Sequence, residues 1–276
     1  MRAVRAYLAH QMTDRAATLT YFAMMSLFPA LLVGVTLLGL FGQQGLVEDA
    51  TNYLLDHGAA PSTVKVIRDT LNNMISTSSG ALGATLLVGL VLALNGASGA
   101  FGAAGRSLNV IYDIDKDRRG MVRRKANDLG IAIVVILLFL VTFVAIFLGG
   151  QIADDLFGKI GLGDDVAKVW SFVRWPVAVL ATVVAYALVY SLAPDREPRR
   201  VHWISTGAIV GVLLWLALSF GFTIYVRNFA HYGAVYGAFG TAIVLLLWLY
   251  LSANAFLFGA ELNAELARTR GSAPGP

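Results

Sequence analysis

The sequence predicts an all-α membrane protein, a bundle of six transmembrane helices with short amphipathic helices outside it. Of its 276 residues, 57% are hydrophobic and 14% are charged, whereas soluble domains average roughly 25% charged residues. Long apolar runs alternate with short polar segments, and about 20 helical residues cross the roughly 30 Å hydrocarbon core. Between two of these runs, residues 116–125 carry six cationic side chains. Because placing one Arg or Lys at mid-bilayer costs at least about 2.5 kcal/mol, we expect this segment to stay in the cytoplasm.

The first part of the chain predicts a short interfacial helix over residues 1–18 and then a first span from Leu19 to Gly42, which carries no charge. Pro29 lies inside this span. Proline removes one backbone hydrogen bond and clashes with the carbonyl four residues earlier, so we expect a kink or a short unwound turn near Ser26 and Pro29. Two interpretations remain open, a kink that serves packing alone and a break that lines a polar cavity.

A polar segment, residues 43–79, separates the first two spans. It contains two short pieces with apolar residues at helical spacing, Val47–Asp56 and Pro61–Ile75. Both are too polar to cross a membrane, and the helical spacing of their apolar residues predicts amphipathic helices. We expect them to lie on the outer surface or to cap the bundle there.

The second span, about Ala81 to Ala104, changes character along its length. Its first half is apolar, and its second half is rich in Gly, Ala and Ser at four-residue spacing. Rows of small residues let helix backbones approach closely in lipid. Close packing is therefore one interpretation of this half, and the other is that Asn95 and Ser98 face a polar cavity.

Four further apolar runs complete the six spans, at about 129–151, 175–193, 203–226 and 239–259. The segments proposed to lie inside hold 15 of the 21 Lys and Arg residues, and those proposed to lie outside hold 6. Cytoplasmic loops carry the excess of Lys and Arg. We therefore predict a multi-pass protein of the bacterial cytoplasmic (inner) membrane with both termini in the cytoplasm. Residues 1–268 are expected to form one membrane domain, and 269–276 a disordered tail.

The residues that enzymes need do not gather in this sequence. It has no cysteine and four histidines, His10, His57, His202 and His231. The predicted topology puts two of them on each side of the membrane, so they cannot share one metal ion. No Gly-rich phosphate loop of the Walker type occurs. We therefore expect no catalytic residues, no cofactor and no metal, and topology already explains the basic net charge without nucleic acid.

The most polar face of any span lies near the end of the sixth, where Asn254, Phe258, Glu261 and Glu265 share one side of a helix. Glu261 has two interpretations. It is an interfacial carboxylate paired with an Arg or Lys of the 104–128 loop, or it is an acid that gates a substrate or ion.

A second cluster of candidate residues lies at the opposite, outer mouth. These residues are candidates for contacts with an anionic headgroup, although ordinary interfacial residues would have the same composition: Arg227, His231, Tyr232 and Tyr236.

Several short motifs, in order along residues 15–268, resemble the YihY/BrkB family of bacterial inner-membrane proteins. They are Thr20–Pro29 (TYFAMMSLFP), Ser98–Phe101 (SGAF), Arg106–Asn109 (RSLN), Tyr112, Tyr236–Gly240 (YGAFG), Trp248–Leu251 (WLYL) and Gly259–Asn263 (GAELN). The resemblance implies a six-span inner-membrane protein without a settled activity. The family has carried the label ribonuclease BN, but a zinc hydrolase of that kind would show a His-x-His-x-Asp-His motif, which this sequence lacks.

The function most consistent with these features is transport or handling of a lipid or small solute across the cytoplasmic membrane. The candidate polar pathway or gate consists of Ser26, Pro29, Asn95, Ser98, Asn254 and Glu261. The alternative is a non-transporting scaffold that docks envelope partners on its outer segments. Expected partners are membrane lipids and either an envelope protein or a second copy of the chain. A continuous polar cavity would favour transport, and a solid bundle with an exposed apolar outer patch would favour the scaffold.

Overall fold

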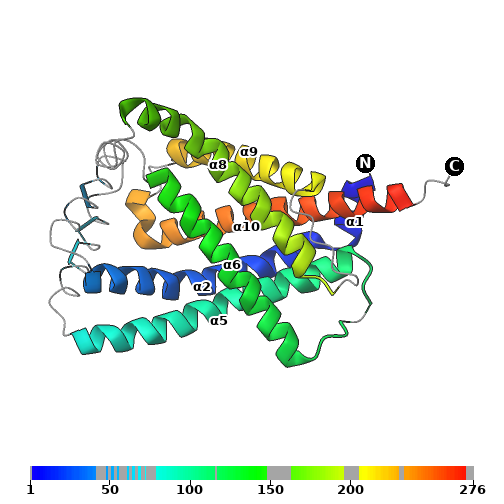
Figure 1. The fold of residues 1–276 in the computed structure, drawn as a ribbon, viewed down its shortest axis with the longest axis horizontal. Helices are drawn as coiled ribbons and strands as arrows, with labels where there is room; N and C mark the ends of the chain where they lie inside the picture. Colours follow the sequence, from blue (N-terminus) through cyan, green and yellow to red (C-terminus); the bar gives the residue numbers. More distant parts are fainter. Residues whose placement is uncertain are drawn as a thin grey trace. The chain divides into compact units, whose positions relative to one another are not determined.

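The structure is a computed structural model, and it describes residues 2–41, 79–115, 117–147, 163–195, 205–229 and 233–271, together with isolated positions between 48 and 72. All regular structure in these ranges is helical, as predicted (Figure 1). The helices are α1 (Arg2–Ala9), α2 (Met12–Phe41), α5 (Ser79–Ile111), α6 (Met121–Phe147), α8 (Gly163–Leu192), α9 (Thr206–Phe229) and α10 (Gly233–Gly271).

Five of these helices, α2, α5, α8, α9 and α10, are long and apolar enough to cross a membrane. They correspond to five of the six predicted spans. The remaining predicted span, 129–151, falls on α6, which is helical as far as Phe147, where this described range ends. The described part of the chain therefore agrees with a six-span bundle.

The helices extend beyond the predicted spans, mainly at the end that carries the basic residues. Helix α5 continues to Ile111 and α6 begins at Met121, so the predicted loop 104–128 contracts to a turn over residues 112–120. Helix α10 continues through Glu261 to Gly271. The predicted tail 269–276 is thus helical in its first residues, and 272–276 lie outside the described residues. Hydropathy fixes only the part of a helix that lies in hydrocarbon, and a helix continues past it because its backbone hydrogen bonds need no lipid.

Pro29 lies inside an uninterrupted helix α2, so the unwound turn expected near it is absent. One proline removes a single backbone hydrogen bond, and the neighbouring turns of this 30-residue helix keep theirs. Ser26 donates its hydroxyl to the carbonyl of Ala23 at 2.9 Å. Its side chain is therefore used within the helix.

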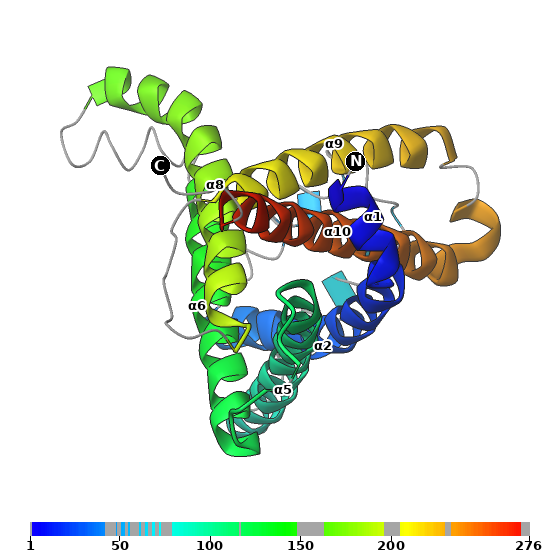
Figure 2. The same ribbon diagram turned by 90° about the vertical axis from the view of Figure 1, so that its right-hand side faces the viewer.

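Contacts divide the chain into two compact units, residues 1–22 with 98–276, and residues 23–97. In the first unit, α9 packs along α10, α8 packs against both α6 and α9, and α1 lies on α10 (Figure 2). In the second unit, the backbones of α2 and α5 approach closely. A Cβ atom placed on Gly96 would lie 2.9 Å from Cα of Ser26. This contact confirms close packing in the small-residue half of the second span.

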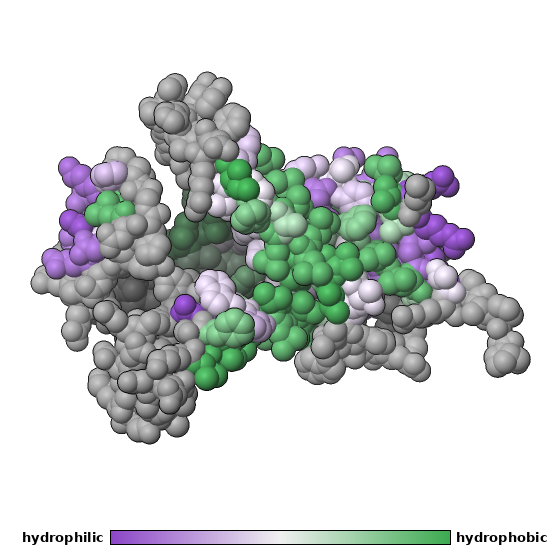
Figure 3. Space-filling view, turned by 90° about the horizontal axis from the view of Figure 1, so that it is seen from above, coloured by the Kyte–Doolittle hydropathy of each residue, from purple (hydrophilic) through white to green (hydrophobic). Residues whose placement is uncertain are grey.

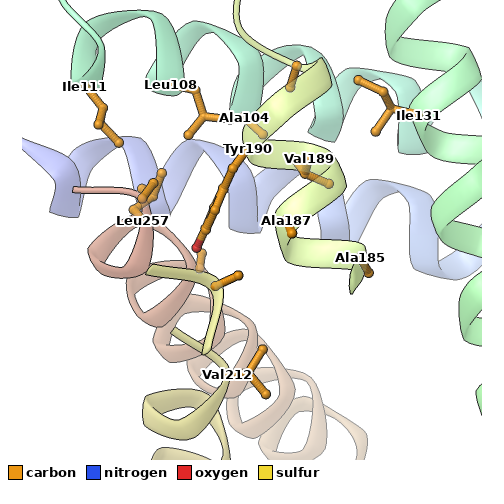
Figure 4. Close-up of a cluster of buried hydrophobic side chains, with 14 of the residues drawn as sticks. Ala104, Leu108, Ile111, Ile131, Ala185, Ala187, Val189, Tyr190, Val212 and Leu257 are labelled. Carbon is orange, nitrogen blue, oxygen red and sulfur yellow. The ribbon is translucent and has the colours of Figure 1, made fainter. Parts of the chain in front are cut away.

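The core of the first unit is built around Tyr190, whose side chain is 2% exposed (Figure 4). Its ring lies 4.9 Å from that of Phe256, and its hydroxyl donates to the Phe256 carbonyl at 2.5 Å. Leu108 and Leu257 pack into the same cluster. A tyrosine hydroxyl buried in a membrane protein needs such a partner, because no water is available to it there.

The backbones of helices α9 and α10 touch at glycines, and further along the same two helices Trp215 and Trp248 make side-chain contacts between them. A Cβ atom on Gly207 would lie 2.2 Å from the carbonyl oxygen of Gly259, and one on Gly259 would lie 2.9 Å from Cα of Gly211. Apart from glycine, no residue fits such a contact. In lipid, where apolar side chains gain little by meeting one another, such close backbone packing is one of the contributions that hold helices together.

The outward surfaces of the helices are apolar. Large hydrophobic side chains on α5, α6, α8 and α9 stay exposed, among them Leu87, Phe139, Phe172 and Phe220, each more than half exposed. Figure 3 shows one face of the molecule, with a broad green apolar area and purple hydrophilic residues gathered away from it. So much exposed apolar surface would favour aggregation in water, and it agrees with helices that face lipid.

Candidate functional site

The polar face predicted on the last span meets the N-terminal helix. Helix α1 ends at Ala9, and Gln11 adopts a left-handed backbone conformation with φ of 53° before α2 begins. This turn holds the end of α1 against α10 (Figures 1 and 2). Five residues form this contact, here named the α1–α10 seam: Tyr7, His10, Asn254, Phe258 and Glu261.

The centre of the seam is a pair of titratable side chains. Nδ1 of His10 lies 2.6 Å from Oε1 of Glu261, and the side chain of Glu261 is 0% exposed. The second carboxylate oxygen, Oε2, is buried and has no hydrogen-bond partner. Leaving a buried carboxylate oxygen without a hydrogen-bond donor is costly. Oε2 of Glu261 is therefore an unsatisfied acceptor that a donor or a cation could occupy.

The partner of Glu261 differs from the one expected from the sequence, which was an Arg or Lys of the 104–128 loop. Helix α5 continues to Ile111 and α6 starts at Met121, so most of that loop is helical, and within it Arg119 bonds Asp117 and Lys125 bonds Ser98. His10 was considered only as a metal ligand, and no local pattern links residues 251 positions apart. The one feature of the sequence that could have indicated this pair is that His10 lies in a predicted interfacial helix just before the first span.

Beside the His10–Glu261 pair, the α1–α10 seam contains a chain of two hydrogen bonds. Tyr7 donates its hydroxyl to Oδ1 of Asn254, and Nδ2 of Asn254 donates to the Tyr250 carbonyl at 2.7 Å. Burial, and then the nearby Tyr250 and Glu261, raise the pKa of Tyr7 to about 12. Tyr7 therefore stays a hydroxyl donor at every physiological pH. The ring of Phe258 packs on Tyr7, with centroids 6.0 Å apart.

The turns at the basic end of the first unit are tied together by Arg119. Its guanidinium bonds both oxygens of Asp117, at 2.9 and 2.8 Å, and the carbonyl of Ala193 at 3.1 Å, and its Nε lies 3.4 Å from Asp195. The hydrogen bonds from Arg119 lower the pKa of Asp117, and the same bonds raise the pKa of Arg119. These contacts join turn 112–120 to the end of α8.

Helix α10 reaches the same end of the first unit. Arg268 donates to Asp113 at 2.6 Å and to the carbonyl of Ile111 at 2.8 Å. The Lys and Arg count assigns four segments to one side of the membrane: the N-terminus, residues 104–128, the residues that follow α8, and the end of α10. The contacts of His10 with Glu261, Arg119 with Asp195 and Arg268 with Ile111 join these four segments. Their meeting at one end is independent support for that grouping.

The other candidate pathway residues are in different surroundings. Ser26 and Pro29 are half-buried and Asn95 is exposed, all three in the second compact unit. Ser98 is buried in the first unit, where its hydroxyl accepts a bond from Nζ of Lys125 at 2.6 Å. Among the candidates, the structure joins Asn254 and Glu261 through the seam.

The predicted outer contacts fall mostly outside the described residues. The backbones of Arg227 and Tyr236 are helical, in α9 and α10, but their side chains are not described, and His231 and Tyr232 lie outside the described ranges. Most of the outer segments Val47–Asp56 and Pro61–Ile75 lie outside them as well. Within the described residues, no three His, Cys, Asp or Glu side chains gather as a metal site would require.

Comparison with known proteins gives one family across nearly the whole chain. Residues 3–275 match the family model described as "Virulence factor BrkB". The chain is 29% identical to the ribonuclease-like protein YfkH of Bacillus subtilis (strain 168), with 96% of this chain and 93% of that protein aligned. It is 28% identical to a UPF0761 membrane protein of Aeromonas salmonicida (strain A449), over 93% and 84% of the two chains. A UPF0761 membrane protein of Rhodospirillum centenum is also 28% identical, but only 54% of its length is covered. No solved structure matches the chain.

Proposed function

This chain belongs to the BrkB family of membrane proteins, and from that premise we propose that it transports or handles a lipid or small solute across the bacterial cytoplasmic membrane. The observation that carries the proposal is the buried carboxylate of Glu261, which lies two residues past the predicted sixth span and within the candidate membrane span Ala242–Thr269 of α10. Ionisable residues inside membrane spans are costly, and they commonly mark substrate or ion pathways.

The geometry around Glu261 supports a gate, in which its pairing breaks and re-forms, better than a permanent ion pair that only stabilises the fold. One oxygen is bonded to His10 and the other has no donor, so the carboxylate has capacity for a second partner. A cationic or hydroxyl group of a passing substrate would meet that need. His10 belongs to the short segment after α1, and α1 is held to α10 by few polar contacts. Release of the pair would let α1 lift from the cytoplasmic end of α10.

We propose further that the chain is not an enzyme. One relative is named ribonuclease-like, but hydrolysis of a phosphodiester needs a cluster of metal ligands or a nucleophile with its base. The described residues contain no such cluster. His10, which they place in a pair with a buried carboxylate, is bonded to Glu261 and so does not stand beside a nucleophile as a general base would.

The test is a comparison of Glu261→Gln with Glu265→Gln in cells that lack the native protein. Glutamine keeps the shape and hydrogen-bonding reach of glutamate and removes the charge. We expect Glu261→Gln to reach the normal protein level and yet fail to restore the lipid and metabolite profile of wild-type cells. Glu265 is the matched control, because it lies one turn further along α10 and pairs with Arg268 instead of His10. Glu265→Gln should restore the profile.

Two results would contradict the proposal. If Glu261→Gln restores the profile fully, Glu261 is no gate. If cells with and without the protein have the same lipid and metabolite profiles, the scaffold alternative is favoured over transport.

The proposed orientation, with both termini and turn 112–120 in the cytoplasm, has its own test. The chain has no cysteine, so single cysteines report their own position. Ser107 is a poor probe because it is 2% exposed, whereas Asp115 in the turn and Lys65 between the first two spans are exposed. A thiol reagent that does not cross membranes should label Lys65→Cys in intact spheroplasts and should label Asp115→Cys only after lysis. The reverse pattern would invert the topology.

A further inference from the structure

The first turn of α6 has an unfavourable arrangement of charge. Arg123, Arg124 and Lys125 follow one another there, and this turn contains no acidic residue. The N-terminus of a helix carries a partial positive charge, so cations in the first turn are disfavoured and anions are favoured. The excess of Lys and Arg on the inner side explains why these residues are basic, but it does not explain why they occupy the positive end of a helix.

The cations around this turn exceed the acids available to them. The positive charges of Arg106, Arg119, Arg124 and Lys125 all lie near enough to act on one buried carboxylate, that of Asp128. Arg119, whose side chain is 4% exposed, is shared with Asp117 and Asp195, and its Nη1 is still buried without a partner. Such an N–H group is costly to bury. An anion with several oxygens would satisfy it and balance the remaining charge.

The same turn presents two apolar side chains to its surroundings. Met121 is 81% exposed and Val122 is 83% exposed. They immediately precede the three cations, at the start of α6 and about two helical turns before its apolar run. Apolar residues beside Lys and Arg at the edge of a span are typical of a membrane interface, where the apolar side chains enter the acyl region and the cations meet headgroups.

We propose that Arg106, Arg119, Arg124 and Lys125, with the exposed Arg123 beside them in the first turn of α6, bind the phosphate of an anionic phospholipid headgroup at the cytoplasmic face, with Met121 and Val122 against its acyl chains. The bond from Lys125 to Ser98 at 2.6 Å links these cations to α5. A soluble phosphate would use the cations alone, whereas the exposed apolar pair commits the site to a lipid. The inference does not depend on transport, since a scaffold would use the same lipid contact.

The test uses the full-length protein in neutral detergent, with phosphatidylglycerol, phosphatidylcholine and inorganic phosphate as separate probes. Binding is measured by the rise in unfolding temperature and by lipid retained in native mass spectrometry. Phosphatidylglycerol should stabilise the wild-type protein more than phosphatidylcholine does, and inorganic phosphate should have little effect. In Arg123→Gln/Arg124→Gln the affinity for phosphatidylglycerol should fall by about 30-fold.

The matched control is Arg2→Gln/Arg5→Gln, which removes two exposed cations from α1 instead. It should keep its phosphatidylglycerol affinity within about threefold of wild type, since it leaves the site intact. Without lipid, Arg123→Gln/Arg124→Gln should unfold near the wild-type temperature, because the relief at the helix N-terminus offsets the lost attraction between Arg124 and Asp128. This measurement separates lost binding from lost folding.

Three results would overturn the inference. Equal loss of affinity in the two double variants would indicate general charge attraction rather than a site. Equal stabilisation by the two lipids would remove the role of the anion. Stabilisation by inorganic phosphate that matches phosphatidylglycerol would leave an oxyanion site with no lipid.

Discussion

Gly259→Ala is expected to destabilise the protein severely, by more than about 3 kcal/mol. The added Cβ atom would lie 2.6 Å from the Gly207 carbonyl oxygen, 2.7 Å from the Tyr190 hydroxyl and 2.9 Å from Cα of Gly211. Two of these three atoms belong to the backbone of α9, so a side-chain movement cannot relieve the clash. The expected readouts are a large fall in unfolding temperature in detergent and a low protein level in membranes.

The comparison with Gly221→Ala separates the clash from helix propensity. Gly221 lies on α9, and a Cβ atom there would meet nothing within 4 Å. Alanine is favoured over glycine inside a helix by about 1 kcal/mol, so this control should be as stable as wild type or slightly more stable. At Gly259 the same gain in helix propensity is smaller than the steric cost, so Gly259→Ala should be less stable than wild type. If both variants match wild type, α9 and α10 do not touch at Gly259.

His10→Ala is expected to have the second largest effect, a loss of about 3–5 kcal/mol. It would leave Glu261 buried with no partner on either carboxylate oxygen, since Oε2 already has none. Truncating one member of a buried charged pair costs more than removing both members. The expected readout is a lower unfolding temperature in detergent, together with release of α1 detected as faster proteolysis at the N-terminus.

The double variant His10→Ala/Glu261→Gln should recover part of that loss, because it no longer buries a charge. Tyr7→Phe is the control within the same seam, since it removes one hydrogen bond to Asn254 and should cost only about 1 kcal/mol. A coupling energy of about 0.5–3 kcal/mol between His10 and Glu261 is expected from the cycle. If the double variant is no more stable than His10→Ala, the pair does not neutralise the carboxylate of Glu261.

Much of the fold could be predicted from the sequence because the signals for it are local. Apolar runs such as Leu19–Gly42 give the positions of spans through a fixed rise per residue. The cations of residues 116–125 group the segments by side, and the contacts of Arg119 and Arg268 place those segments together. The spacing of Asn254, Phe258 and Glu261 put them on one helix face, and all three do line the seam with α1.

The helix ends and the exposure of Asn95 could not be predicted in this way. The predicted spans end near Ala104 and Gly259, and helices α5 and α10 continue past them to Ile111 and Gly271. Asn95 is polar within an apolar run, and the structure leaves its side chain exposed, which does not distinguish a cavity from another polar surrounding. A single polar residue has the same local pattern whether it faces a cavity, a neighbouring helix or the outside.

The sequence by itself determined the class of the protein, the number of spans it predicts and the grouping of its polar ends, because hydropathy and charge act on each segment separately. The tertiary structure alone decided that Glu261 pairs with His10, 251 residues away, and that Gly259 meets the backbone of Gly207. Both contacts depend on how two separate helices are placed against each other. That placement arises from the fit of many small surfaces at once, and no single stretch of sequence contains it.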